Sequence, residues 1–214
     1  MLTSLSIKEF AARMATQEPP PGGGSTAALS GLMAAGLQEM VVNLSEGQPE
    51  LAVHAGFLAI KKNDLSRLHT LLEELVDRDA QAFRKVMEAF KMPKDSPVEI
   101  VIRDKAIQES MYLAAEVPIE TARACLEVLE ISRQLLDKTN PHALGDLTVG
   151  ALAAHTGAVG ALLSTAMNLP FLKDEAVVKA FEGQVLLLRT SADELIQIVK
   201  DNVYSNSTYA VMKG

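Results

Sequence analysis

The sequence of 214 residues contains no Trp, and aromatic residues make up only 4 % of it. A core without large aromatic side chains must be filled by Ala, Leu, Val, Ile and Met, a set that favours close helix packing over a sheet. No segment shows sustained alternation of apolar and polar residues, which would indicate strands. The sequence therefore predicts an all-α protein with essentially no sheet.

The single cysteine, Cys125, excludes an internal disulfide. It lies in the apolar helical segment ACLEVLEI, which favours a buried, unreactive thiol over a nucleophile. One thiol is compatible with a reducing cytoplasm, where we expect the protein to reside. The first residues, MLTSLSIKEFAARM, lack the basic and apolar segments of a secretory signal.

The chain has no excess of basic residues. It contains 20 Lys and Arg and 27 Asp and Glu, which gives a net charge of −7. An acidic chain with scattered basic residues is a poor candidate for coating nucleic acid, so we expect no nucleic-acid partner. The four histidines are scattered and have no Cys partner or H-x-x-x-H spacing. We therefore expect no metal site.

Charged residues are absent from Leu147 to Leu169, a stretch long enough to span a bilayer. The same stretch contains His155 and several Ser and Thr residues, and it is rich in Ala and Gly. We interpret it as a helix buried inside the protein, because small residues let other helices approach closely. No membrane contact is then expected, and a membrane helix bundle is the alternative.

Helical periodicity and Pro-containing breaks predict one multi-helix domain over residues 1–214. A capping box, Ser6-x-x-Glu9, places the first helix start near Ile7. Further helices are expected over 26–44, 49–91, 98–115, 119–138, 146–168 and 174–204, with Pro118 ending one of them. A helix of about 40 residues would reach about 60 Å, so the third is either kinked or part of a dimer.

The segment EPPPGGGST joins three prolines to three glycines immediately before Ser25, which we expect to cap the next helix. It is neither a Walker A loop nor a G-x-G-x-x-G turn. Three glycines exceed what a turn requires, and free N–H groups at a helix start attract negative or electron-rich atoms. From the residues alone, a simple turn and a ligand cradle are both open.

Two pairs of polar residues are further candidates. Asp77 and Asp79 lie inside a helical segment that Asp does not favour, but residues two apart do not share a face and form no carboxylate pair. A solvated helix face is the simpler interpretation, and a functional Asp79 stays open. Asn140 and Asp146 bracket the loop TNPHALGD, where Asp146 either caps the next helix or offers a carboxylate at the mouth of a cleft.

Several motifs resemble, in order, the C-terminal family of formiminotransferase-cyclodeaminases. PPPGGGSTAALSGLMAAGLQEMVVNLS is similar to the family's P-x-P-G-G-G-S-x-A-A-L and M-V-x-N-L motifs. LVDRDAQAFRKVMEAFKMPK resembles its acidic, Ala-rich helix with a Pro-Lys turn, and RDKAIQESMYLAAEVPIETA follows. The N-x-x-A-x-x-D motif (Asn140 to Asp146) and A-x-N-L around Asn168 complete a resemblance that covers nearly the whole chain. One departure is Ser164, where many relatives carry Asn.

The resemblance implies an all-α homodimer that pairs through helices and binds a tetrahydrofolate substrate at the subunit interface. It implies a methenyltetrahydrofolate cyclohydrolase or a formiminotetrahydrofolate cyclodeaminase, and free-standing members are similar to the cyclohydrolase. The folate is the substrate, the number of its glutamates is open, and no tightly bound cofactor is expected. A non-catalytic helical oligomerisation protein is the competing hypothesis.

The resemblance also supplies site residues. The catalytic candidates are Asp79, placed first, and Asp146, because both proposed reactions require proton transfer. The candidates for folate binding are Pro21, Gly22, Gly23, Gly24, Ser25, Asn43, Lys94, Asn140 and Asn168. An anionic glutamate tail requires a local basic patch, for which Lys61, Lys62, Arg84, Lys85 and Lys94 are candidates. Ser164 leaves the choice between the two reactions open.

Overall fold

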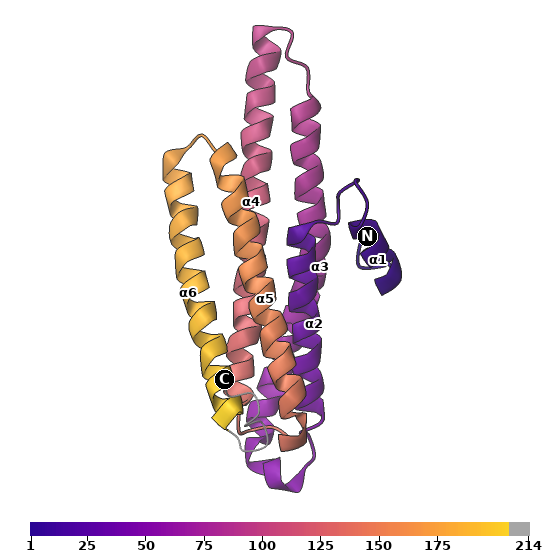
Figure 1. The fold of residues 1–214 in the computed structure, drawn as a ribbon, viewed down its shortest axis with the longest axis vertical. Coiled ribbons are helices and arrows are strands. Elements are labelled where there is room, and N and C mark those ends of the chain that lie inside the picture. The colour runs from indigo at the N-terminus through magenta and orange to yellow at the C-terminus, as the bar shows by residue number, and fades with distance from the viewer. Residues whose placement is uncertain (206–214) are drawn as a thin grey trace.

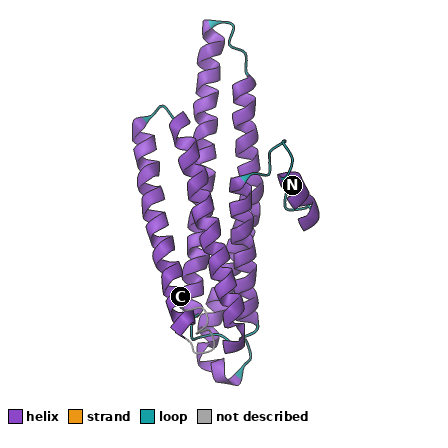
Figure 2. Cartoon of the chain, in the orientation of Figure 1, coloured by secondary structure: helices purple, strands orange, loops and turns teal. Residues whose placement is uncertain are grey.

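The computed structural model describes residues 1–205, which form six α-helices and no strand. The helices are α1 (Ile7–Met14), α2 (Gly23–Asn43), α3 (Ala55–Lys91), α4 (Pro97–Leu135), α5 (Leu144–Asn168) and α6 (Glu175–Ser205). Short 3-10 helices at Pro49–His54, Pro141–Ala143 and Leu169–Phe171 lie between them. The all-α prediction is confirmed for these residues, and Figure 2 shows the short loops that join the helices.

Helices α2 to α5 form an elongated bundle, and α6 packs along α4 and α5 (Figure 1). One face of α3 supplies the leucines at the centre: Leu58, Leu65, Leu68, Leu72 and Leu75, each at most 1 % exposed. Each such side chain contributes about 1.5–3 kcal/mol through burial. Helix α3 runs unbroken for 37 residues, or about 56 Å. It projects with α4 beyond the upper ends of α2 and α5.

The small residues of α2 let this helix lie close against α5. A Cβ added to Gly157 would lie 2.8 Å from the Ala27 carbonyl oxygen and 2.8 Å from the sulfur of Cys125. At the seam, the Ser30 hydroxyl donates to the Ala153 carbonyl oxygen at 2.8 Å. Burial raises the pKa of the Cys125 thiol to about 12, so the prediction of a buried, inert thiol is confirmed.

The predicted helix break at Pro118 is wrong, because α4 continues through this residue. Proline has no N–H, so the carbonyl of Ala114, four residues earlier, loses its helical partner. The side-chain amide of Asn168 donates to that carbonyl oxygen at 2.7 Å. The Thr165 hydroxyl donates to the neighbouring carbonyl of Ala115 at 3.1 Å. Side chains of α5 thus satisfy the groups that proline exposes.

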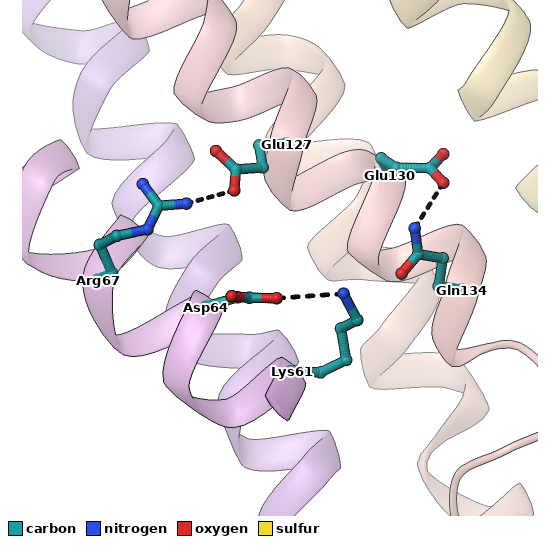
Figure 3. A network of polar contacts seen from close by, with 6 residues as sticks. All are labelled: Lys61, Asp64, Arg67, Glu127, Glu130 and Gln134. Atoms are coloured by element: carbon teal, nitrogen blue, oxygen red, sulfur yellow. Dashed lines mark hydrogen bonds and ion pairs between the residues drawn. The ribbon is translucent and has the colours of Figure 1, made fainter. Parts of the chain in front are cut away.

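Charged side chains join α3 to α4 on the outside of the bundle. Figure 3 shows the Arg67–Glu127 ion pair between these helices and the Lys61–Asp64 pair within α3, whose Nζ–Oδ2 distance is 3.1 Å. Such solvent-exposed pairs contribute at most about 1 kcal/mol each. The core leucines, rather than these pairs, hold the two helices together.

Helix α5 is buried on one side and exposed on the other, so the expected burial inside the protein holds for one of its faces. Ala151, Ala154 and Ala158 face the interior, whereas Leu163 is 61 % and Met167 is 73 % exposed. The span 141–171 is long and apolar enough to cross a membrane by length and composition, and 44 % of its most apolar window is buried. Over 147–168 the exposed side of α5 therefore forms a surface without charged side chains in the described part of the chain.

Candidate functional site

A cavity of about 680 Å³ lies between the start of α2, the middle and upper part of α3, the facing part of α4 and the end of α5. This volume falls in the usual range for small-molecule sites. The lining residues are Pro19, Pro20, Gly22, Gly23, Gly24, Asp79, Ala82, Phe83, Val86, Phe90, Met111, Ala114, Gly160, Leu163, Ser164, Met167, Asn168 and Phe171. Asp79 is the one charged side chain among them.

Asp79 is half-buried and accepts a hydrogen bond at Oδ2 from the Ser25 hydroxyl, 2.7 Å away. Burial raises the pKa of the Asp79 carboxyl, and hydrogen bonds from the Ser25 hydroxyl and backbone amide partly oppose this rise. The simpler interpretation of a solvated face is therefore wrong. A carboxyl of raised pKa inside a cavity is suited to accepting and returning a proton.

Ser25 does not cap α2, so this expectation is wrong. The helix starts at Gly23, the N-cap is Gly22 in an extended conformation, and Ser25 is fully buried within the first turn. Glycine is itself accepted at the N-cap, which releases the Ser25 hydroxyl to bond Asp79 instead. Sequence alone missed this role because the two residues lie 54 positions apart.

The glycines differ in what surrounds them. A Cβ added to Gly24 would lie 2.6 Å from the Cγ atom of Asp79, so the carboxylate rests directly on the α2 backbone. A Cβ added to Gly22 would meet no atom of residues 1–205 within 4 Å. Gly24 is therefore required for the approach of Asp79, while Gly22 and Gly23 present backbone to the cavity. The free N–H groups of a helix start favour electron-rich atoms there.

Asp77 is also buried, but it does not line the cavity. Its carboxylate accepts hydrogen bonds from the Leu2 amide at 2.5 Å and from the Thr3 hydroxyl at 3.1 Å. The solvated-face interpretation is wrong for Asp77 as well. The two aspartates serve separate partners, in agreement with the prediction that they are not a carboxylate pair.

The remaining wall of the cavity is apolar and aromatic, which the sequence analysis missed. Phe83 and Phe90 are 37 % and 43 % exposed, and Phe171, in the 3-10 helix that follows α5, lines the same cavity. Phe83 and Phe90 lie four and eleven residues after Asp79, on the same helical face, and this spacing was a usable signal. Aromatic faces of this kind stack on flat conjugated rings.

Ser164 and Asn168 both line the cavity from α5. The Ser164 hydroxyl donates to the Gly160 carbonyl oxygen at 3.1 Å, and it lies opposite Gly23. Asn168 uses its amide nitrogen on the Ala114 carbonyl described above, which leaves its side-chain oxygen as the available polar group.

The structure does not bring Asn43, Asn140 and Asp146 to this cavity. Asp146 is exposed in the first turn of α5, about 33 Å along the helix from Asn168. Asn43 is exposed at the far end of α2. Asn140 has a local role there, since its backbone amide donates to the Ser45 hydroxyl at 2.8 Å and its side chain accepts from the His142 amide at 3.0 Å.

The basic side chains expected to bind a glutamate tail fall into two groups, one near the start of α3 and one towards or beyond its end. Lys61 and Lys62 lie in the first turns of α3, paired with Asp64 and Glu46, far from the cavity. Lys94 is exposed in the loop joining α3 to α4, and Arg84 and Lys85 are exposed on α3. Pro21 is buried beside the cavity without lining it.

Arg103, which the sequence analysis did not select, contacts Phe90, one of the residues that line the cavity. Its Nη2 donates to the Phe90 carbonyl oxygen at 3.1 Å, and its guanidinium carbon is 5.8 Å from the centre of the Phe90 ring. The Nε atom has no hydrogen-bond partner among residues 1–205. Arg103 thus places a positive charge beside an aromatic residue that lines the cavity.

Comparisons with known proteins agree with the family resemblance of the sequence. The family model described as formiminotransferase-cyclodeaminase matches residues 6–186. A methenyltetrahydrofolate cyclohydrolase of Methylorubrum extorquens is 32 % identical over 203 residues, covering 92 % of this chain and 97 % of the relative. The formimidoyltransferase-cyclodeaminase of Mus musculus is 30 % identical over 81 % of this chain, which matches only 32 % of the longer mouse protein.

A solved structure shares the fold. The crystal structure of formiminotetrahydrofolate cyclodeaminase from Thermotoga maritima superposes with a TM-score of 0.86 at 24 % identity. The match covers 96 % of this chain and 98 % of that chain.

Proposed function

The chain belongs to the formiminotransferase-cyclodeaminase family, and we propose that it hydrolyses 5,10-methenyltetrahydrofolate to 10-formyltetrahydrofolate. The observation that carries this proposal is the half-buried carboxyl of Asp79, which faces the glycine backbone of α2 in an apolar cavity of ligand size. The Methylorubrum relative, which matches this chain over almost its full length, favours hydrolysis over cyclodeamination.

The chemistry of the substrate matches this arrangement. Methenyltetrahydrofolate carries a cationic amidinium carbon between N5 and N10, and an anionic carboxylate attracts that charge. Water adds to this carbon as Asp79 accepts one of its protons. Asp79 returns that proton to N5 as the carbon–N5 bond breaks, and the hydroxyl proton of the tetrahedral intermediate passes to solvent as the formyl C=O forms. A carboxyl with a raised pKa takes up the proton more readily than an ordinary aspartate. The net reaction releases one proton.

The shape of the cavity suggests an orientation for the folate. The pterin and the reacting carbon would lie near Asp79 and the glycine backbone, the aminobenzoate beside Phe83, about 6 Å further along α3, and the glutamate towards Phe90. Asp79 and Phe90 lie eleven residues apart on α3, or about 17 Å, which suits an extended folate. The glutamate tail would then reach Arg103, with Lys94 beyond it for any further glutamates.

Cyclodeamination is the second candidate, because the bifunctional relatives carry that name. In that reaction N10 attacks the formimino carbon and ammonia leaves. A single assay separates the possibilities: purified protein is mixed with each substrate, and methenyltetrahydrofolate absorbance and ammonia are followed. We expect methenyltetrahydrofolate to disappear faster than in buffer. Ammonia release from formiminotetrahydrofolate alone would assign the second reaction, and no turnover or binding of either folate would contradict both.

We also propose that the protein is a homodimer formed through the exposed sides of α2 and α5. Neither helix carries Asp, Glu, Lys or Arg over 22–38 or 147–169, and Met33 and Val149 are 54 % and 56 % exposed. A matched pair of variants tests the surface by sedimentation: Met33→Glu with Val149→Glu, against Ile60→Glu on α3 as the control. The double variant should be monomeric at concentrations where the control remains dimeric, and a monomeric wild type contradicts the proposal.

A two-fold axis perpendicular to the helices of this face would run the two bundles in opposite directions. The lower end of one subunit, with its Asn43 and Asp146, would then approach the cavity of the other. Mixing inactive Asp79→Asn with inactive Asp146→Asn protein tests this arrangement, because the mixed dimer retains one intact site. Recovery to roughly a quarter of the wild-type rate, as random exchange predicts for a C2 dimer, supports it. No recovery after verified subunit exchange contradicts it.

A further inference from the structure

The first 22 residues form an arm that begins and ends on the same turn of α3. At its start, the Leu2 amide and the Thr3 hydroxyl donate to Asp77 at 2.5 and 3.1 Å. Just after its end, the Ser25 hydroxyl donates to Asp79 at 2.7 Å. Asp77 and Asp79 of the D-R-D sequence therefore hold the two ends of the arm. Asp77, which holds the start, does not line the cavity.

Between these two anchors the arm has few contacts with the bundle. Figure 1 shows α1 beside the bundle rather than within it. Phe10 is the only buried residue of α1, at 6 % exposure, and Ile7 is 89 % exposed. The Thr26 hydroxyl contacts the Met14 sulfur at 3.1 Å. The arm therefore docks through Phe10 and through its first residues, where Leu2 is 4 % exposed in the same core cluster.

The arm also supplies part of the candidate site. Pro19 and Pro20 line the cavity immediately before the glycines of α2. Their rings form part of the cavity wall. If the start of the arm is released from Asp77, Pro19 and Pro20 lose this anchor on their N-terminal side. The Asp79 carboxyl still keeps its hydrogen bond from Ser25.

We propose that Asp77 is a positioning residue for substrate binding, which docks the arm so that Pro19 and Pro20 close one side of the folate site. This inference rests on the proposed function. Asp77 itself does not contact the ligand. Releasing the arm should weaken folate binding and leave the chemistry at Asp79 nearly intact. A purely structural Asp77 would instead change stability without a selective effect on binding.

Asp77→Ala and Asp77→Asn form a matched pair for the test. Alanine leaves the Leu2 amide buried without an acceptor, whereas asparagine retains an acceptor oxygen of similar size. Cleavage by trypsin after Lys8 and Arg13, both exposed on α1, reports release of the arm without any folate. KM, kcat and the dissociation constant of 5-formyltetrahydrofolate report the site.

For Asp77→Ala we expect faster cleavage and a KM raised at least about fivefold with kcat within about twofold, since one buried hydrogen-bond acceptor is lost. Asp77→Asn should restore most of the wild-type KM. Bound 5-formyltetrahydrofolate should slow cleavage at Arg13 in the wild type. If Asp77→Ala does not fold, Leu2→Ala releases the arm from its own side and should give the same KM effect.

Faster cleavage with an unchanged KM and an unchanged dissociation constant would overturn the role of Asp77. A fall in kcat alone would do the same. If the wild type neither binds nor converts a reduced folate, the proposed function fails instead, and the trypsin assay still shows whether Asp77 docks the arm.

Discussion

The carboxylate of Asp79 lies directly over the backbone of Gly24, where a Cβ atom would come within 2.6 Å of its Cγ atom. The neighbouring Ser25 donates a hydrogen bond to the same carboxylate. The glycine motif of α2 and the acidic helix α3 are thus parts of one site. Their relation gives the glycines a defined function, because only a residue without a side chain lets the carboxylate take this position.

Gly24→Ala should therefore displace Asp79 and lower kcat by at least about tenfold, since proton transfer depends on its placement. Gly183→Ala is the matched control, because a Cβ at that helical position meets nothing within 4 Å. Steady-state kinetics of both variants check the prediction. Wild-type kcat in Gly24→Ala would show that Asp79 does not need this position.

The pKa of Asp79 links activity to stability. Burial raises the pKa of the Asp79 carboxyl in the folded protein above its ordinary value of 3.8. The folded state therefore holds this proton more tightly than the unfolded state does, and the free energy of unfolding falls as pH rises through the folded pKa. Asp79→Asn removes this loss and should raise the melting temperature at pH 7. The gain should shrink as pH falls towards 4. Thermal unfolding across this range checks it, and a gain that grows at low pH would contradict the assignment.

Asn168 and Pro118 should be coupled across the α4–α5 contact. Asn168→Ala leaves the Ala114 carbonyl without its donor and should cost about 1–3 kcal/mol in unfolding free energy. Pro118→Ala restores a backbone N–H for that carbonyl. In this background the Asn168 substitution should cost less. A double-mutant cycle measured by denaturant unfolding checks the coupling, and additive effects would refute it.

Arg103 should act on the glutamate tail of the folate. Arg103→Ala should raise KM at least about tenfold for a substrate with its glutamate, because a charge-assisted hydrogen bond is lost. An analogue without the glutamate should show a much smaller change. Lys62→Ala, on a lysine paired with Glu46 far from the cavity, serves as the control. An equal increase in KM for both substrates would show that Arg103 does not bind the glutamate tail.

Local signals in the sequence predicted the helices well. The capping box of Ser6 and Glu9 is present as expected, and the small residues of α2 do pack closely against α5. The break at Pro118 failed because its compensation comes from Asn168, 50 residues later in the chain. Long-range partners of this kind leave no periodic signal.

The site was predictable only in part, for the same reason. The glycine segment and Asp79 stood out as local anomalies, a run of glycines and an aspartate within a helix. The bond that joins Ser25 to Asp79 spans 54 positions. The spacing of Phe90 from Asp79 was a usable signal, but the same spacing is typical of core residues, so it did not single out Phe90. Asn43 lies at the opposite end of α2 from the glycines, as the helix expected over 26–44 already implied.

Turnover of methenyltetrahydrofolate by Asp79→Asn tests the central claim most directly. The near-ultraviolet absorbance of the substrate is followed with wild-type and variant protein at saturating concentration, after folding of both is verified. Loss of a proton-transferring carboxyl should lower kcat by at least about tenfold. A variant that turns over at the wild-type rate would remove Asp79 from the reaction and contradict the account.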